Sequence, residues 1–90
     1  MKNQISKKEW QSIQSLLLQR CNTGYEPTHV EVKLNKDIRS DYCLDVLPLS
    51  EAGSRSLHCI EEVVDVVRAF NLSLWVGYNP EINKVVAHIF

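Results

Sequence analysis

Cysteine and histidine side chains are the groups in this sequence best suited to nucleophilic or acid–base chemistry. The chain has three of each: Cys21, Cys43 and Cys59, and His29, His58 and His88. Cys59 is the candidate catalytic nucleophile, because it falls near the start of a predicted helix, where the helix dipole favours a thiolate. Its neighbour His58 points about 100° away around that helix, toward solvent. This spacing leaves Cys59 a weak catalytic candidate and favours its packing as a small apolar residue.

Metal and cofactor sites in small domains usually show paired ligands or glycines at short spacing. No C-x₂-C or H-x₃-H pair occurs in this sequence. His29 and His88 fall on predicted strands and could lie close across the sheet. The three glycines, Gly24, Gly53 and Gly77, are too widely separated to form a phosphate-binding loop. We therefore predict neither a metal site nor a cofactor.

The acidic residues form two groups, and each has a structural interpretation. The first group is spaced by four but lacks the ligand pattern of a calcium-binding loop: Asp37, Asp41 and Asp45. The second lies in the first half of a predicted helix and projects into water, within reach of Arg68: Glu61, Glu62 and Asp65. Neither group predicts a pair of catalytic carboxylates.

The first half of the chain predicts one helix and two strands. Ser6 and Glu9 form a capping box, and apolar residues recur at helical spacing over residues 6–22: Trp10, Ile13, Leu17 and Cys21. After Pro27 the apolar period changes from 3.6 to 2. This predicts a hairpin with strands at 30–34 and 42–47 and a turn-rich connection that opens at residues 35–37. Pro48 begins a predicted loop over residues 48–55.

The second half repeats this order. Residues 56–70 predict a helix capped by Ser54 or Ser56. Its apolar side takes nearly half of the circumference: Leu57, Ile60, Val63, Val64, Val67 and Phe70, with Cys59 and Val66 at the edge. Asn71 is a left-handed stop. A second hairpin follows, with strands at 72–78 and 84–90 around a turn that begins at Asn79-Pro80.

These elements predict a single α+β domain over residues 1–90, since a chain of this length makes one small domain. The simplest packing of the αββαββ order is a two-layer sandwich. In it, both helices cover one face of a four-stranded, mainly antiparallel sheet. Periodicity leaves the order of the strands in that sheet open.

The face of this sheet turned away from the helices is the best candidate for a functional surface. Its first half is polar, with His29, Glu31, Lys33, Cys43 and Asp45. The second half gathers larger side chains: Trp75, Val86, His88 and Phe90, with Leu47 beside them. Clustered exposed aromatic residues are typical of partner surfaces, so we predict an interaction surface there. The alternatives are that the loop 48–55 or the N-terminal residues cover this surface, or that a bulge near Val85 and Val86 turns one valine inward.

Small size and missing motifs favour a non-enzymatic protein-binding or dimerisation module, of the adaptor or inhibitor type, that uses this face. The alternative is a small enzyme, thiol-dependent through Cys59 or assembled at a subunit interface. A further alternative is single-stranded nucleic-acid binding on the sheet face. Ten basic and eleven acidic residues give a net charge of −1, and the basic residues are scattered, which disfavours nucleic acid.

The number of cysteines and the hydropathy of the chain indicate the cellular compartment in which the protein resides. Three cysteines are an odd number without close pairing, which argues against a disulfide framework and favours the cytoplasm. No apolar run approaches the ~18 residues of a membrane span. The first residues also lack the apolar core of a signal peptide. We therefore expect a protein partner or a homodimer, and no membrane.

Overall fold

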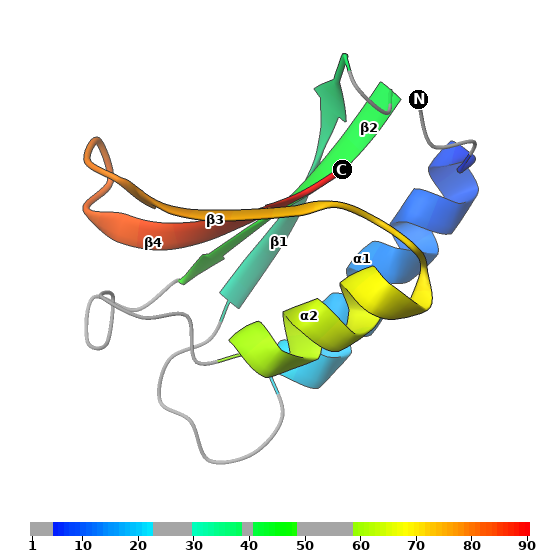
Figure 1. The fold of residues 1–90 in the computed structure, drawn as a ribbon, viewed down its shortest axis with the longest axis horizontal. Coiled ribbons are helices and arrows are strands. Elements are labelled where there is room, and N and C mark those ends of the chain that lie inside the picture. The colour runs from blue at the N-terminus through cyan, green and yellow to red at the C-terminus, as the bar shows by residue number, and fades with distance from the viewer. Residues whose placement is uncertain (1–4, 23–29, 39–40, 49–58) are drawn as a thin grey trace.

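The structure, a computed structural model, describes residues 5–22, 30–38, 41–48 and 59–90. These residues form two helices and four strands (Figure 1): α1 (Lys7–Cys21), β1 (Val30–Asp37), β2 (Asp41–Pro48), α2 (Ile60–Ala69), β3 (Leu74–Asn79) and β4 (Lys84–Ile89). The αββαββ order confirms the predicted α+β class.

Helix α1 begins and ends close to where its sequence predicts. The Ser6 hydroxyl accepts a hydrogen bond from the Glu9 backbone N–H at 3.2 Å, as a capping residue does. At the other end, Asn22 holds the start of β1 with two hydrogen bonds. Its Oδ1 accepts from the Val30 N–H at 2.8 Å, and its Nδ2 donates to the Val30 carbonyl at 3.1 Å. This pair fixes α1 against the edge of the sheet.

The four strands form one antiparallel sheet in the order β1-β2-β4-β3. The last strand in the chain, β4, therefore lies in the interior of the sheet, between β2 and β3 (Figure 1). Its register against β2 places Val46 opposite Ala87. Strands β1 and β3 are the two edges.

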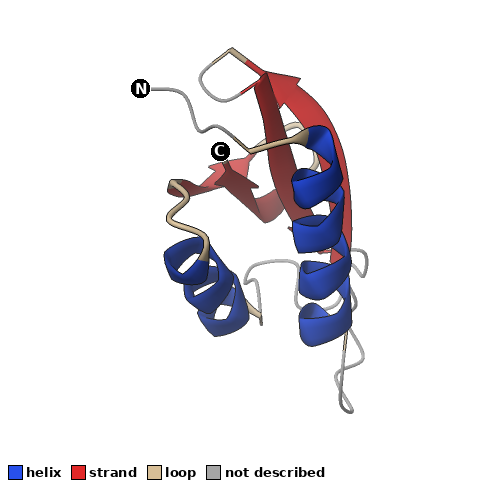
Figure 2. Ribbon diagram, turned by 90° about the vertical axis from the view of Figure 1, so that its right-hand side faces the viewer, coloured by secondary structure: helices blue, strands red, loops and turns tan. Residues whose placement is uncertain are grey.

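Both helices pack on the same face of the sheet, which is its inner face. One cluster of buried residues joins that face to α1 through Trp10 and Leu17, and to α2 through Val63 and Val66. The sheet contributes Val30, Val32, Leu44, Val46, Ala87 and Ile89 to this cluster. Figure 2 shows the two helices side by side. This arrangement confirms the predicted two-layer sandwich.

The first hairpin is longer than its sequence predicts. Strand β1 continues through Asp37, where a turn was expected to open at Asn35, and Asp37 pairs with Asp41. The connection is shorter because Asp41 adopts a left-handed backbone with φ of 64°, which aspartate tolerates better than most residues. Pro48 belongs to β2, opposite Val30, and is not the first residue of a loop.

The buried side of α2 differs from the predicted one. Val66, expected at the edge, is buried, whereas Phe70 is exposed. The reason is that α2 ends at Ala69, so Phe70 takes the C-cap position with a non-helical backbone and leaves the helical arc. The described part of α2 starts at Ile60. The predicted caps Ser54 and Ser56 fall in 49–58, outside the described residues.

The β3–β4 hairpin extends away from the two helices (Figure 1). Val76 and Tyr78 lie on the inner face, yet they are 43% and 55% exposed. Asn71, with φ of 53°, is the predicted left-handed stop before this hairpin. The hairpin thus carries apolar side chains that the core does not bury.

Candidate functional site: the outer face and the free edge of the sheet

The outer face brings together three of the residues expected to form an interaction surface. Trp75 lies opposite His88 in the β3–β4 register, and Val86 lies opposite Gly77. With Asp45 of β2, the side chains of Trp75, Val86 and His88 line a shallow hollow of about 380 Å³. Its walls combine apolar, aromatic and ionisable groups.

The other two expected surface residues border this hollow. The Phe90 ring packs against the His88 ring, with 5.5 Å between the ring centroids. Leu47 pairs with Glu31 of β1, and continuing the β2–β4 register by one residue places it opposite Val86. Both side chains are half-buried, whereas Trp75 is 53% exposed. The outer face therefore exposes one large aromatic side chain rather than an extended apolar patch.

Gly77 explains how the Trp75 side chain lies on the sheet. A Cβ atom placed on Gly77 would come within 2.2 Å of the Trp75 ring atom Cη2. The indole therefore lies along β3, over Gly77, which is the one residue of that strand without a side chain. A glycine inside a strand commonly marks such a close approach.

His88 is held between two carboxylates on the outer face. Its Nδ1 lies 2.5 Å from Asp45 Oδ1, and its Nε2 lies 2.9 Å from Asp37 Oδ2. The second oxygen of Asp45 accepts a hydrogen bond from the Asn35 amide at 2.5 Å. The Asp37 side chain is only 8% exposed. Three neighbouring strands thus contribute to one polar network.

Cys43 adds a sulfur atom to this network. The Cys43 side chain lies on the outer face, yet the residue is only 2% exposed. Its thiol donates a hydrogen bond to the Lys36 carbonyl, with 3.9 Å between sulfur and oxygen. The ligand atoms of Asp37, Cys43 and His88 all lie within 4.8 Å of one another. Sequence reasoning missed this cluster, because it placed Asp37 in a turn and left the β2–β4 pairing open. A signal was present in the alternation of Asn35, Asp37, Cys43 and Asp45.

The free edge of β3 was not predicted as part of the surface. Ser73 and Phe90 exchange both backbone hydrogen bonds, at 2.8 and 3.0 Å. Antiparallel ladders alternate, so Trp75 and Gly77 also direct their backbone groups toward β4. The N–H and C=O groups of Leu74, Val76 and Tyr78 therefore point away from β4. No described strand lies on that side of β3.

The two cysteines outside this face form a buried pair where α1 ends and α2 begins. Cys59 is 2% exposed and takes the N-cap position of α2 without a side-chain capping hydrogen bond. A hydrogen bond from the Cys21 thiol lowers the pKa of Cys59, although burial acts in the opposite direction. The same hydrogen bond, with burial adding to it, raises the pKa of Cys21. His58, considered as a partner for Cys59, lies outside the described residues.

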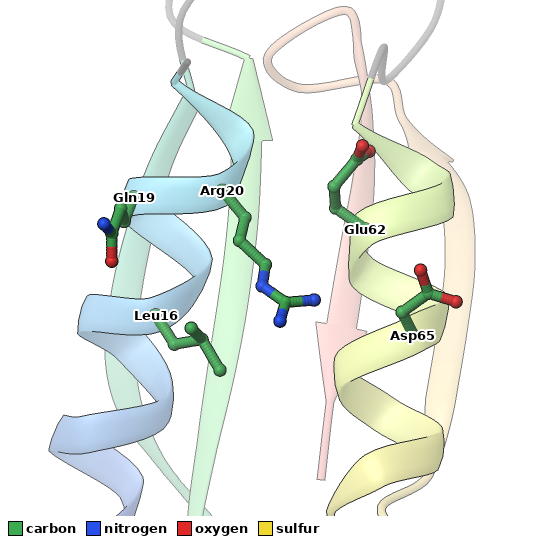
Figure 3. Close-up of a pocket in the computed structure, with 5 residues that line it drawn as sticks. All are labelled: Leu16, Gln19, Arg20, Glu62 and Asp65. Atoms are coloured by element: carbon green, nitrogen blue, oxygen red, sulfur yellow. The ribbon is translucent and has the colours of Figure 1, made fainter.

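A second hollow of about 560 Å³ lies between the helices (Figure 3). Arg20 of α1 extends across it toward α2, which presents Glu62 and Asp65 on the facing side. These acids were expected to project into water beside Arg68. The opposite charges of Arg20 and of the two acids attract each other across the contact between the helices. Their role is therefore structural, because this attraction favours the packing of α1 beside α2.

Neither described helix is long and apolar enough to cross a membrane. No protein-family model matches the sequence, and neither a curated protein nor a solved structure matches it. The two features of the described residues that bear on function are the free edge of β3 and the polar network around His88.

Proposed function

We propose that this domain is a protein-binding module that pairs with a second copy of itself through the free edge of β3. One observation carries the proposal. Of the six large apolar side chains that are exposed in the described residues, four lie on β3 and the turn that follows it: Trp75, Val76, Tyr78 and Ile82. Exposed apolar side chains gathered along one element are typical of a partner surface.

The backbone of β3 supports strand pairing. Leu74, Val76 and Tyr78 direct their N–H and C=O groups to the free side, as the β3–β4 ladder requires. An edge strand with such groups is a template for another strand. Pairing would join two four-stranded sheets into one continuous sheet, flanked by Trp75 on the outer face and by Val76 and Tyr78 on the inner face.

The charge pattern of β3 favours a second copy as the partner. In a two-fold symmetric interface the same patch of both chains is in contact. A charged residue near the symmetry axis therefore lies close to the same residue of the second copy, and the two like charges repel each other. The residues Leu74–Asn79 include no charged side chain and no proline. Self-pairing of β3 therefore brings no like charges together. Since one short strand makes a small interface, we expect a dissociation constant on the order of micromolar.

The two other functions considered from the sequence have less support. A Cys59 thiol that is 2% exposed is not accessible to a substrate in this conformation. The outer face presents the carboxylates of Glu31 and Asp45, which repel nucleic-acid phosphates. The proposal also assigns the domain to the cytoplasm, because an odd number of cysteines does not suit the disulfide framework of a small secreted domain.

The test is the oligomeric state of two variants at one position. Val76→Pro removes an N–H that faces the free edge and leaves the ladder to β4 intact, whereas Val76→Thr keeps that N–H. Size-exclusion chromatography with light scattering, over about 1–100 μM protein, should show a dimer for the wild type and for Val76→Thr. Val76→Pro should run as a monomer, with an unchanged circular dichroism spectrum.

Two outcomes would contradict the proposal. A wild-type chain that remains monomeric at about 100 μM does not use this edge for self-association. A dimer that persists in Val76→Pro but dissociates in Trp75→Ser would place the contact on the outer face of the hairpin, where the sequence first indicated it.

A further inference from the structure

We propose that Asp37, Cys43 and His88 bind a zinc ion on the outer face of the sheet. One ligand comes from each of the strands β1, β2 and β4. The site is independent of the β3 edge, because none of its ligands belongs to β3.

The distances between the donor atoms fit a small metal site. The carboxylate oxygen of Asp37, Sγ of Cys43 and the His88 ring nitrogen all lie within 4.8 Å of one another. Zinc bonds of ~2.0–2.3 Å in a tetrahedral arrangement separate ligand atoms by about 3.3–3.7 Å. The present separations exceed these values by no more than about 1.5 Å. Water supplies the fourth ligand.

The chemistry of the donors selects the metal. A thiolate, an imidazole and one carboxylate are a mixed set that zinc accepts, whereas calcium and magnesium require oxygen ligands. Cys43 is 2% exposed and the Asp37 side chain 8%. Because these two ligands are buried, they shield the bound ion from solvent on the side of the ion that faces the sheet.

The surroundings of His88 are those of a metal ligand. A metal-binding histidine commonly donates its other ring N–H to a carboxylate, which fixes the tautomer and the orientation of the ring. Nδ1 of His88 faces Asp45 Oδ1 at 2.5 Å, and the Asn35 amide holds the other oxygen of that carboxylate. Nε2 then points to Asp37, at 2.9 Å, and toward the metal position. Asp45 and Asn35 are positioning residues in this arrangement.

Binding exchanges protons for the ion. The Cys43 thiol loses its proton when the zinc–sulfur bond forms, and the His88 ring nitrogen binds zinc through its lone pair, so that nitrogen carries no proton in the complex. The protons displaced by the ion leave to solvent. The bound ion would join β1, β2 and β4 through side chains, in addition to their backbone ladders.

The experiment uses the full chain, reduced and freed of metal with a chelator. Zinc is titrated in competition with a chromophoric chelator, and Co²⁺ is added separately as a spectroscopic probe. We expect one equivalent of either ion to bind, and Co²⁺ to show a thiolate-to-metal charge-transfer band. His88→Gln and Asp37→Asn should each weaken zinc binding by more than about tenfold.

Two matched variants distinguish this site from the buried thiol pair. Cys43→Ser should abolish the charge-transfer band, and Cys21→Ser should leave it unchanged. Asp45→Asn should keep the band but weaken zinc binding by about 10- to 100-fold, as the loss of an orienting carboxylate does. Circular dichroism of each metal-free variant shows whether it folds. If Cys43→Ser does not fold, His88→Gln and Asp37→Asn decide the result.

The proposal is overturned by either of two results. One is the absence of zinc binding at about 100 μM free Zn²⁺, which exceeds the dissociation constants of zinc sites in proteins. The other is a charge-transfer band that survives in Cys43→Ser and disappears in Cys21→Ser, because the ion would then bind the Cys21–Cys59 pair.

Discussion

The two edge strands of the sheet, β1 and β3, have opposite characters. Strand β1 carries four charged residues, Glu31, Lys33, Lys36 and Asp37, and α1 packs against its inner face. Strand β3 has no charged residue and extends beyond the helices. Charged side chains on an edge strand prevent pairing with other chains. This sheet therefore has one edge protected against association and one edge suited to it.

The largest effect should come from giving β3 the charge that β1 already has. Val76→Lys places an ammonium group at the free edge, so in a symmetric dimer two such groups approach each other. We expect the dissociation constant of the dimer to rise by about 100-fold or more. Glu31→Lys, which places the same ammonium group on the exposed surface of β1, should leave it unchanged. Sedimentation equilibrium of both variants checks this, and equal weakening would remove the distinction between the edges.

The next largest effect should be on the free energy of unfolding, when a valine is shortened to alanine on each of the two edge strands. Val32 of β1 is 4% exposed, whereas Val76 of β3 is 43% exposed. Val32→Ala should lower the free energy of unfolding by about 2–3 kcal/mol, because it leaves a cavity under α1. Val76→Ala should change it by no more than about 0.5 kcal/mol. Urea unfolding below the dissociation constant of the dimer separates folding from association, and similar losses would mean that the core also depends on Val76.

Removing charges from the edge strand β1 should have a smaller effect, which is a change in the size of the oligomer. Lys33→Val combined with Lys36→Val takes two exposed charges from that edge. Of the four charges on β1, only those of Glu31 and the mostly buried Asp37 then remain, so the β1 edge can pair as well as the β3 edge and species larger than a dimer should appear. Light scattering over a concentration series detects them. A variant that remains a dimer would show that the Lys33 and Lys36 charges are not what keeps the β1 edge from pairing.

The smallest effect should come from Gly77→Ala. The added Cβ collides with the ring of Trp75, which is exposed and can rotate away. We expect a loss of unfolding free energy of no more than about 1 kcal/mol. The Trp75 fluorescence should shift to the red as the indole enters solvent, and a Trp10→Phe background isolates that signal. An unchanged spectrum would indicate that the indole does not rest on Gly77.

The sequence predicted the elements better than it predicted their contacts. Capping by Ser6, the period change after Pro27 and the stop at Asn71 are local signals, and the structure confirms the elements that they delimit. The strand order is not local. Nothing in the periodicity of β2 or β4 indicates that residues 44–46 pair with residues 87–89.

The candidate site shows the same limit. Trp75, Val86 and His88 were expected on one face, because alternation within a strand sets the face of each side chain. The network around His88 was not expected, since it requires the β2–β4 register and an extended β1 that brings Asp37 alongside. The free edge of β3 also follows only from the strand order.

The interior position of β4 has a consequence for synthesis on the ribosome. Strand β2 ends at Pro48, and its neighbour on one side is β4, which ends at Ile89. About 40 residues have to be translated between these two points, which takes roughly 2–8 s at cellular elongation rates. During that interval the nascent chain contains α1, β1 and β2 with one flank of β2 open. Until β4 is added, the backbone groups of β2 on that flank have no strand partner and can pair with another chain.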